Sequence, residues 1–94
     1  MPIFLVENAI YGYEWWDKNG AKYQQDKRNN LYAAYKTLVA AGDTALFYVE
    51  GDKMLAPYIE PQSTSVDGVH PTDLGMYRMA DFWVEYLTTF LGLP

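Results

Sequence analysis

A single histidine and an acidic residue three positions before it are the clearest candidates for chemistry in this chain. Asp67 and His70 lie in a short segment that also contains Gly68 and Pro71. Histidine is the usual general base near neutral pH, because its ordinary pKa is about 6.5. Such a base needs its second ring nitrogen held by an acceptor, which fixes the tautomer and stabilises the imidazolium that forms. The pattern therefore predicts that His70 is a base and that Asp67 orients it.

The same two residues also fit a purely structural role. Asp67 is of a type that forms turns, and His70 would then be an ordinary loop residue before a helix. A metal site is a poor alternative, because the chain has no cysteine and no second histidine. The sequence thus predicts no metal and no other cofactor. No nucleophile is evident, since Ser63 and Ser65 lie nearby but nothing in their spacing selects either one.

The composition predicts a small folded domain that binds neither nucleic acid nor an anionic membrane surface. The chain has 94 residues, of which 50% are apolar and 17% aromatic, and its net charge is −5. Nucleic-acid backbones attract patches of Lys and Arg, and the one basic cluster here is Lys27-Arg28. No apolar run is long enough for a membrane span or a signal-peptide core. The absence of cysteine leaves the compartment open, and we expect a bacterial periplasmic or secreted location if the parent protein carries a signal peptide.

Two apolar runs and the segment between them predict a βαβ unit. Residues 3–7 and 45–50 are continuous apolar runs that end in glutamate, a pattern typical of parallel strands buried on both faces. Residues 22–41 have a helical pattern, and Gly42 is suited to end that helix. The expected apolar stripe of this helix is formed by Leu31, Tyr35, Leu38 and Val39. The helix would be the crossover between the two strands.

Two loops and a second helix complete the expected order of elements. Residues 8–20 and 51–66 are rich in glycine, proline and polar residues, which indicates loops. Thr72 is a good N-cap for a final helix that Gly92 would end. Two strands alone form only a marginal sheet, since about three are needed for independent stability. The sequence therefore predicts either part of a larger α/β structure or copies that associate to complete the sheet.

Residues 67–75 resemble the last conserved block of the SGNH hydrolases, the GDSL-type lipases and esterases. In that family an Asp-x-x-His-Pro segment precedes the C-terminal helix, usually with a glycine a few residues later, as Gly75 is here. The resemblance implies a flavodoxin-like three-layer sandwich with a parallel sheet, of which residues 1–94 would be the C-terminal portion with an incomplete sheet. It also implies an ester substrate, acyl or acetyl and including esters of carbohydrates. In that family the histidine is the base and the aspartate its orienter, roles that would fall to His70 and Asp67.

The other motifs of the family are not recognisable in this chain. Its members carry a Gly-Asp-Ser nucleophile motif after their first strand, and a Gly and an Asn that help to form the oxyanion hole. Gly42-Asp43-Thr44 is superficially similar, but it precedes a strand and has Thr in place of Ser. Asn8 follows a strand without the family's Gly-x-Asn-Asp context. We therefore expect the nucleophile and the oxyanion hole to come from outside this chain, which alone would be inactive.

An aromatic cluster in the first loop provides candidate substrate-binding residues. Tyr11, Tyr13, Trp15 and Trp16 follow the carboxyl end of a strand, where ligands of open α/β sheets bind. Their rings could stack on a sugar or an acyl group. Alternatively, they pack on other parts of the domain or close the loop.

Two glutamates that end the strands allow a different chemistry. Glu7 and Glu50 could form a carboxylate pair of the kind that cleaves glycosidic bonds. They could also be solvated strand ends, which is the interpretation we favour.

Two classes of function remain open on the sequence alone. In the first, the chain belongs to a serine ester hydrolase, and its partners are an ester substrate and the missing N-terminal part of the domain. In the second, it is a non-catalytic module that self-associates or binds carbohydrate and retains the Asp-x-x-His loop. A Gly-Asp-Ser motif after an apolar strand upstream of residue 1 would favour the first class, and sugar binding without ester turnover would favour the second.

Overall fold

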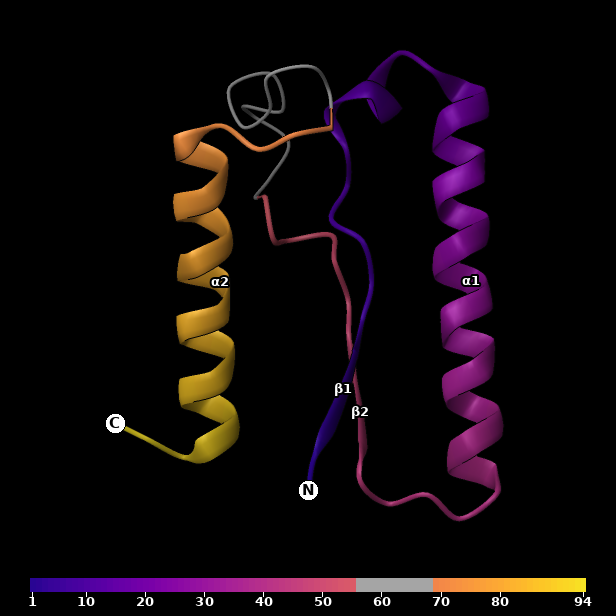
Figure 1. The fold of residues 1–94 in the computed structure, drawn as a ribbon, viewed down its shortest axis with the longest axis vertical. Coiled ribbons are helices and arrows are strands. Elements are labelled where there is room, and N and C mark those ends of the chain that lie inside the picture. Colours follow the sequence, from indigo (N-terminus) through magenta and orange to yellow (C-terminus); the bar gives the residue numbers. More distant parts are fainter. Residues whose placement is uncertain (56–68) are drawn as a thin grey trace.

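Two parallel strands lie between two long helices, so the chain forms three layers (Figure 1). This computed structural model describes residues 1–55 and 69–94, and within the first range it leaves out the side chain of Trp15. The elements in chain order are strand β1 (Ile3–Val6), the 3-10 turn η1 (Gly12–Trp15), helix α1 (Lys18–Ala40), strand β2 (Leu46–Val49) and helix α2 (Asp73–Leu91). In Figure 1 the two helices flank the strands on opposite sides.

The two strands form a parallel pair, as the sequence predicts. Ile3 pairs with Leu46 and Val6 pairs with Val49, and the register is continuous between them. Helix α1 connects the carboxyl end of β1 to the start of β2 and is therefore the crossover of a βαβ unit. The predicted order of elements is confirmed, and the strand boundaries differ from prediction by one residue.

Aromatic side chains cover both faces of this pair of strands. Phe4 and Phe47 are neighbours in the register, and their rings lie 5.0 and 4.7 Å from the ring of Phe90 on α2. The next residue of β2, Tyr48, points to the opposite face, where its ring lies 5.0 Å from Tyr32 and 5.3 Å from Tyr35 on α1. Edge-to-face and tilted pairs at these distances are favourable packing contacts. The expectation that both faces are covered is thus confirmed.

Helix α1 begins earlier than the sequence predicts. The N-cap at Asp17 and the contact of Tyr13 with Gly20 outweigh the low helix propensity of that glycine. Asp17 is the N-cap, and its side chain accepts a hydrogen bond from the Gly20 N–H at 3.0 Å. Gly20 therefore lies in the first turn of the helix and not in a loop. A Cβ at this position would stand only 2.4 Å from the ring of Tyr13. The prediction of a loop through residue 20 is wrong. Because Gly20 has no side chain, the turn η1 can pack directly against the helix at this position.

The face of α1 that packs in the molecule is more polar than expected. It is formed by four side chains spaced four, three and four residues apart, namely Gln24, Arg28, Leu31 and Tyr35. The first two are buried, and the last two are half-buried. Leu38 and Val39 are exposed, contrary to the predicted apolar stripe. The packed face extends toward the N-terminus of the helix, where polar groups replace apolar ones.

The predicted start of α2 and the predicted glycines at the C-terminal ends of both helices are confirmed. Thr72 is the N-cap of α2, and its hydroxyl accepts a hydrogen bond from the Gly75 N–H at 3.1 Å. Gly42 and Gly92 follow the two helices with φ of 103° and 70°, a conformation that favours glycine. Within residues 1–55 and 69–94, no helix is both long and apolar enough to cross a membrane.

The apolar core is small and lies along β2 and just beyond its carboxyl end. Among the described residues, the buried apolar side chains are Leu46, Val49, Met54 and Leu55. Many other large apolar side chains are exposed, above all on α2. So small a core agrees with the expectation of a partial sheet.

Candidate active site

A pocket of about 420 Å³ lies at the carboxyl ends of the two strands. The segment after β1 forms one wall with residues 6–9 and Tyr11, and the segment after β2 contributes residues 54–55. Residues 69–71 and the side chains of Met79 and Trp83 on α2 close the remaining sides. Ligands of open α/β sheets bind beyond the carboxyl ends of the strands, so this pocket lies where the topology favours a site.

His70 lines this pocket from the segment that leads into α2. It is exposed, and it stands two residues before the N-cap Thr72, whose bond to Gly75 fixes the first turn of the helix. His70 therefore lies at the same pocket as the end of β1, although the two are more than sixty residues apart in the chain. Asp67 lies outside the described residues, so its partnership with His70 stays a prediction.

The four aromatic residues predicted to bind substrate have different surroundings. Tyr11 lines the pocket together with His70. Tyr13 stacks on Tyr11, with ring centroids 5.8 Å apart, and its hydroxyl accepts a hydrogen bond from the Gln24 amide at 2.8 Å. Trp16 is 63% exposed, and the side chain of Trp15 lies outside the described part of the chain. Tyr11 thus lines the same pocket as His70, whereas Tyr13 is bonded to α1 through Gln24.

A buried ion pair fixes the wall that follows β1. Arg28 donates to both carboxylate oxygens of Glu14, from Nη1 at 3.1 Å and from Nη2 at 3.0 Å, and each side chain is only 8% exposed. The same guanidinium donates to the carbonyls of Ala9 at 3.2 Å and Asn8 at 3.4 Å. Bidentate, charge-assisted bonds of this kind are strong and geometrically specific. Helix α1 therefore holds residues 8–14 in place from behind the pocket.

Gln24 extends this network by one turn of the helix. Its carbonyl oxygen accepts a hydrogen bond from the Asn8 side chain at 3.1 Å, while its amide nitrogen donates to Tyr13. Asn8 is therefore engaged with α1. Within the described part of the chain, every buried side-chain nitrogen and oxygen has a partner. A fully satisfied polar network rigidifies its surroundings, whereas an unsatisfied one is costly.

Glu7 is part of a second polar cluster, contrary to the expectation of a solvated strand end. Its carboxylate accepts a short hydrogen bond from the Tyr48 hydroxyl and a second one from the Gly51 N–H at 3.1 Å. Burial, together with the adjacent Glu7 carboxylate, raises the pKa of Tyr48 well above its ordinary value. Glu50 is exposed, as expected for a solvated strand end. Only Glu7 of the two lines the pocket.

Comparison with known proteins identifies the family. Residues 1–88 match the GDSL-like lipase/acylhydrolase family. The chain belongs to this family. No curated protein matches this chain. The predicted GDSL-type relationship is thereby confirmed.

A solved structure has a similar fold. A protein described as a GDSL-like lipase from Bacteroides ovatus superposes with a TM-score of 0.86 at 20% sequence identity. The match covers 99% of this chain and 27% of that protein, so this chain spans about a quarter of its length. The likeness confirms the predicted α/β fold with a partial sheet.

Sequence reasoning missed the polar groups that shape this GDSL-family pocket. Arg28 was visible only as half of a basic pair, yet it is buried. The available signal was its position, since Arg28 lies three residues before Leu31 and so on the same face of the helix. Glu14 gave no comparable signal, and Glu7 was noted only as a glutamate that ends a strand. In the described ranges, no group of three or more acidic, histidine or cysteine side chains could hold a metal ion.

Proposed function

We propose that this chain is the C-terminal portion of one GDSL-type serine ester hydrolase domain and that it contributes the base of the catalytic triad. His70 takes the proton of a serine hydroxyl as that oxygen attacks the ester carbonyl, and then delivers the proton to the leaving alcohol. Asp67 accepts a hydrogen bond from the other ring nitrogen. The serine and the oxyanion hole come from parts of the domain beyond this chain. The position of His70 on a pocket at the carboxyl ends of the strands carries the proposal.

The pocket favours an acyl or acetyl ester as substrate. Apolar side chains from three elements line it, among them Val6, Met54 and Trp83, and these suit the acyl group. The aromatic loop after β1 provides ring faces beside it, with Tyr11 on the pocket and Trp16 exposed. Ring faces of this kind suit a sugar as the alcohol part of the ester, so carbohydrate esters are included in the proposed substrate class.

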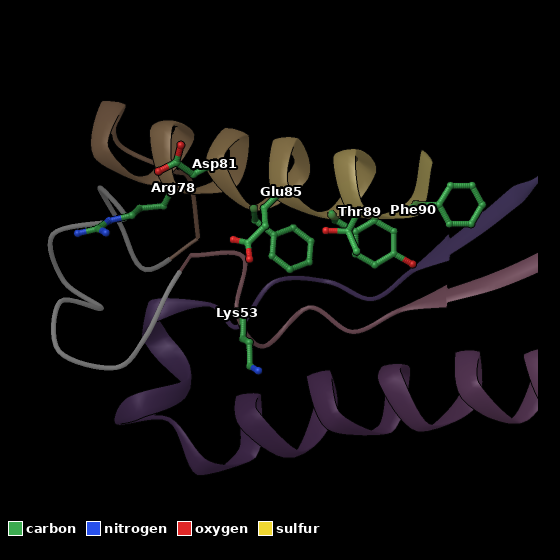
Figure 2. A pocket seen from close by; sticks show the side chains of 8 residues that line it. Lys53, Arg78, Asp81, Glu85, Thr89 and Phe90 are labelled. Carbon is green, nitrogen blue, oxygen red and sulfur yellow. The ribbon is translucent and has the colours of Figure 1, made fainter. Parts of the chain in front are cut away.

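The two flanks of α2 differ in a way that indicates where the rest of the domain packs. One flank is polar and borders a second pocket of about 570 Å³, which its side chains line together with Lys53 and three aromatic residues of α2, namely Phe82, Tyr86 and Phe90 (Figure 2). That flank carries Arg78, Asp81, Glu85 and Thr89. The opposite flank carries exposed apolar side chains spaced three and four residues apart, namely Tyr77, Ala80, Val84, Leu87 and Leu91.

The apolar flank lies on the β1 side of the molecule. Met79 and Trp83 share a pocket with Val6 of β1, and each residue of an α-helix turns about 100° from the one before it. Ala80 and Val84 thus continue around the helix from those contacts, away from the polar flank. Alternating three- and four-residue spacing is typical of a seam that packs against another helix. We propose that the remaining part of the domain extends the sheet at β1 and covers this flank, and that a second copy does so when that part is absent.

Ester turnover by the full-length protein tests the proposed function. His70→Ala should lower kcat/KM for p-nitrophenyl acetate about 10⁴-fold or more, because no other group takes the serine proton. Lys22→Ala is the matched control, since Lys22 forms only an exposed pair with Asp26 and should leave turnover unchanged. Full turnover by His70→Ala would exclude His70 as the base.

Asp67→Asn should lower kcat about 10⁴-fold with little change in KM, because the imidazole would then be held in the wrong tautomer.

A non-catalytic carbohydrate-binding module is the second candidate function. The observation that favours it is Trp16, whose side chain is exposed just before helix α1. Oligosaccharide binding that quenches tryptophan fluorescence and is lost in Trp16→Ala, in a full-length protein with no ester turnover, would support this alternative. Ester turnover dependent on His70 would exclude it.

A further inference from the structure

We infer that Glu7 is a positioning residue that sets the distance between the two loops forming the pocket walls. The inference rests on the proposed function, because it concerns the pocket that contains His70. Glu7 is the first residue after β1, and it lines this pocket. It acts through the two groups that donate hydrogen bonds to it. One is on β2 itself and the other is in the turn that follows β2.

The first of these groups belongs to the turn after β2. The Gly51 N–H donates to Glu7 Oε1 at 3.1 Å. Gly51 is buried, and a Cβ at this position would lie 2.1 Å from the carbonyl oxygen of Asn8. The two loops are thus in direct contact at this point, with no room for a side chain. Met54 and Leu55 follow within four residues, are 2% and 7% exposed, and line the pocket.

The second group is the hydroxyl of Tyr48 on β2. A phenol has one proton to donate, and its two possible acceptors are Glu7 Oε2, in a short hydrogen bond, and the Arg28 carbonyl at 3.3 Å. The Tyr48 hydroxyl therefore donates to Glu7, because that bond is the shorter of the two and its acceptor is negatively charged. The ring of Tyr48 is packed against Tyr32 and Tyr35 of α1, so the hydroxyl is a fixed point.

The carboxylate is suited to this role because both groups are donors. An ionised carboxylate has two acceptor oxygens, so it satisfies Tyr48 and Gly51 at once. A glutamine of the same shape has one acceptor oxygen, which can stay on the Gly51 N–H, and an NH₂ group, which can only donate to the Tyr48 hydroxyl while that hydroxyl donates to the more distant Arg28 carbonyl. Glu7→Gln should therefore replace two charge-assisted bonds with weaker neutral ones and let the wall that carries Met54 and Leu55 move.

The test compares matched glutamine variants in the full-length protein, with p-nitrophenyl esters of increasing acyl length. Glu50→Gln is the control, because Glu50 follows β2 as Glu7 follows β1 but is exposed. Glu7→Gln should raise KM and change the ratio of kcat/KM between butyrate and acetate esters by about tenfold, as wall movement alters the fit of each added methylene. Glu50→Gln should change the ratio less than about twofold, since an exposed carboxylate touches neither wall. Tyr48→Phe removes one bond but leaves the ionised carboxylate bonded to the Gly51 N–H, so it should shift the ratio in the same direction by a smaller factor.

A merely structural role gives a different result. Loss of folded protein lowers kcat equally for all esters and leaves KM and the acyl-length ratio unchanged, and that outcome in Glu7→Gln would overturn the inference. If Glu7→Gln is insoluble, Tyr48→Phe decides, and a wild-type ratio in that variant would overturn the inference. Failure of the proposed function is distinguishable, because it would appear as full turnover in His70→Ala. If turnover depends on His70 but Glu7→Gln gives the same acyl-length ratio as Glu50→Gln, only the inference about Glu7 is rejected.

Discussion

Helix α1 buries charged and polar side chains, whereas helix α2 exposes a row of apolar ones. On α1, Arg28 and Gln24 are buried and bonded to residues 8–14. On α2, Val84 is 66% exposed and Leu91 is 64% exposed. The difference shows that the partners of the buried polar groups of α1 are contained in this chain, while a suitable partner for the outer flank of α2 is not among the described residues. The pocket wall held by α1 is therefore preformed, and the incomplete side of the structure is that of α2 and the β1 edge.

The largest expected effect on stability concerns the buried charge of α1. Arg28→Met should lower the free energy of unfolding of the full-length protein by about 3–5 kcal/mol, because it leaves the Glu14 carboxylate buried without its partner. Lys22→Met is the control. It breaks the exposed pair with Asp26 and should cost at most about 1 kcal/mol. Urea denaturation measures both, and equal losses in the two variants would contradict the assignment of α1 as the preformed side.

The exposed flank of α2 should respond in opposite directions in the short chain and in the full-length protein. Val84→Glu should make residues 1–94 more monomeric in sedimentation velocity, because it places a charge in the apolar seam. In the full-length protein the same change should cost about 1–3 kcal/mol, since the charge would be buried by the covering helix. Thr89→Glu, on the polar flank, is the control and should do neither. A full-length protein that tolerates Val84→Glu would show that nothing covers the flank.

A smaller effect is expected from Tyr48 at alkaline pH. Its raised pKa means that the folded state holds the phenolic proton more tightly than the unfolded chain does. The stability that follows is present below the ordinary tyrosine pKa of about 10 and is lost as pH rises above it. The urea midpoint should thus fall more steeply above about pH 10 in the wild type than in Tyr48→Phe. Parallel curves would show that Glu7 and burial do not act on this hydroxyl.

The elements of this fold were predictable because their signals are local. Thr72, Gly42 and Gly92 mark helix ends by their own chemistry, and the apolar runs of β1 and β2 predict buried parallel strands without reference to their neighbours. The start of α1 was not predictable in this way. Whether Gly20 breaks or continues a helix depends on the ring of Tyr13, which reaches it only after η1 has folded against α1.

The candidate site was predictable in place but not in detail. The loop before the last helix and the strand ends could be identified from sequence, and His70 does line a pocket there. The bonds that shape the pocket join residues far apart, since Arg28 lies 14 positions after Glu14 and Tyr48 lies 41 positions after Glu7. No periodicity encodes such pairs, so Arg28 was noted only as part of a basic cluster and Glu7 was expected to be a solvated strand end.

The central claim is that His70 activates a serine supplied by the rest of the domain, and the rate of serine labelling by a fluorophosphonate tests it most directly. The full-length wild type should label at one serine. In His70→Ala the same serine should be labelled at a rate at least about 10³-fold lower, because the serine hydroxyl would keep its proton. Equal labelling rates in the two proteins, or a wild type that labels at no serine, would contradict the account.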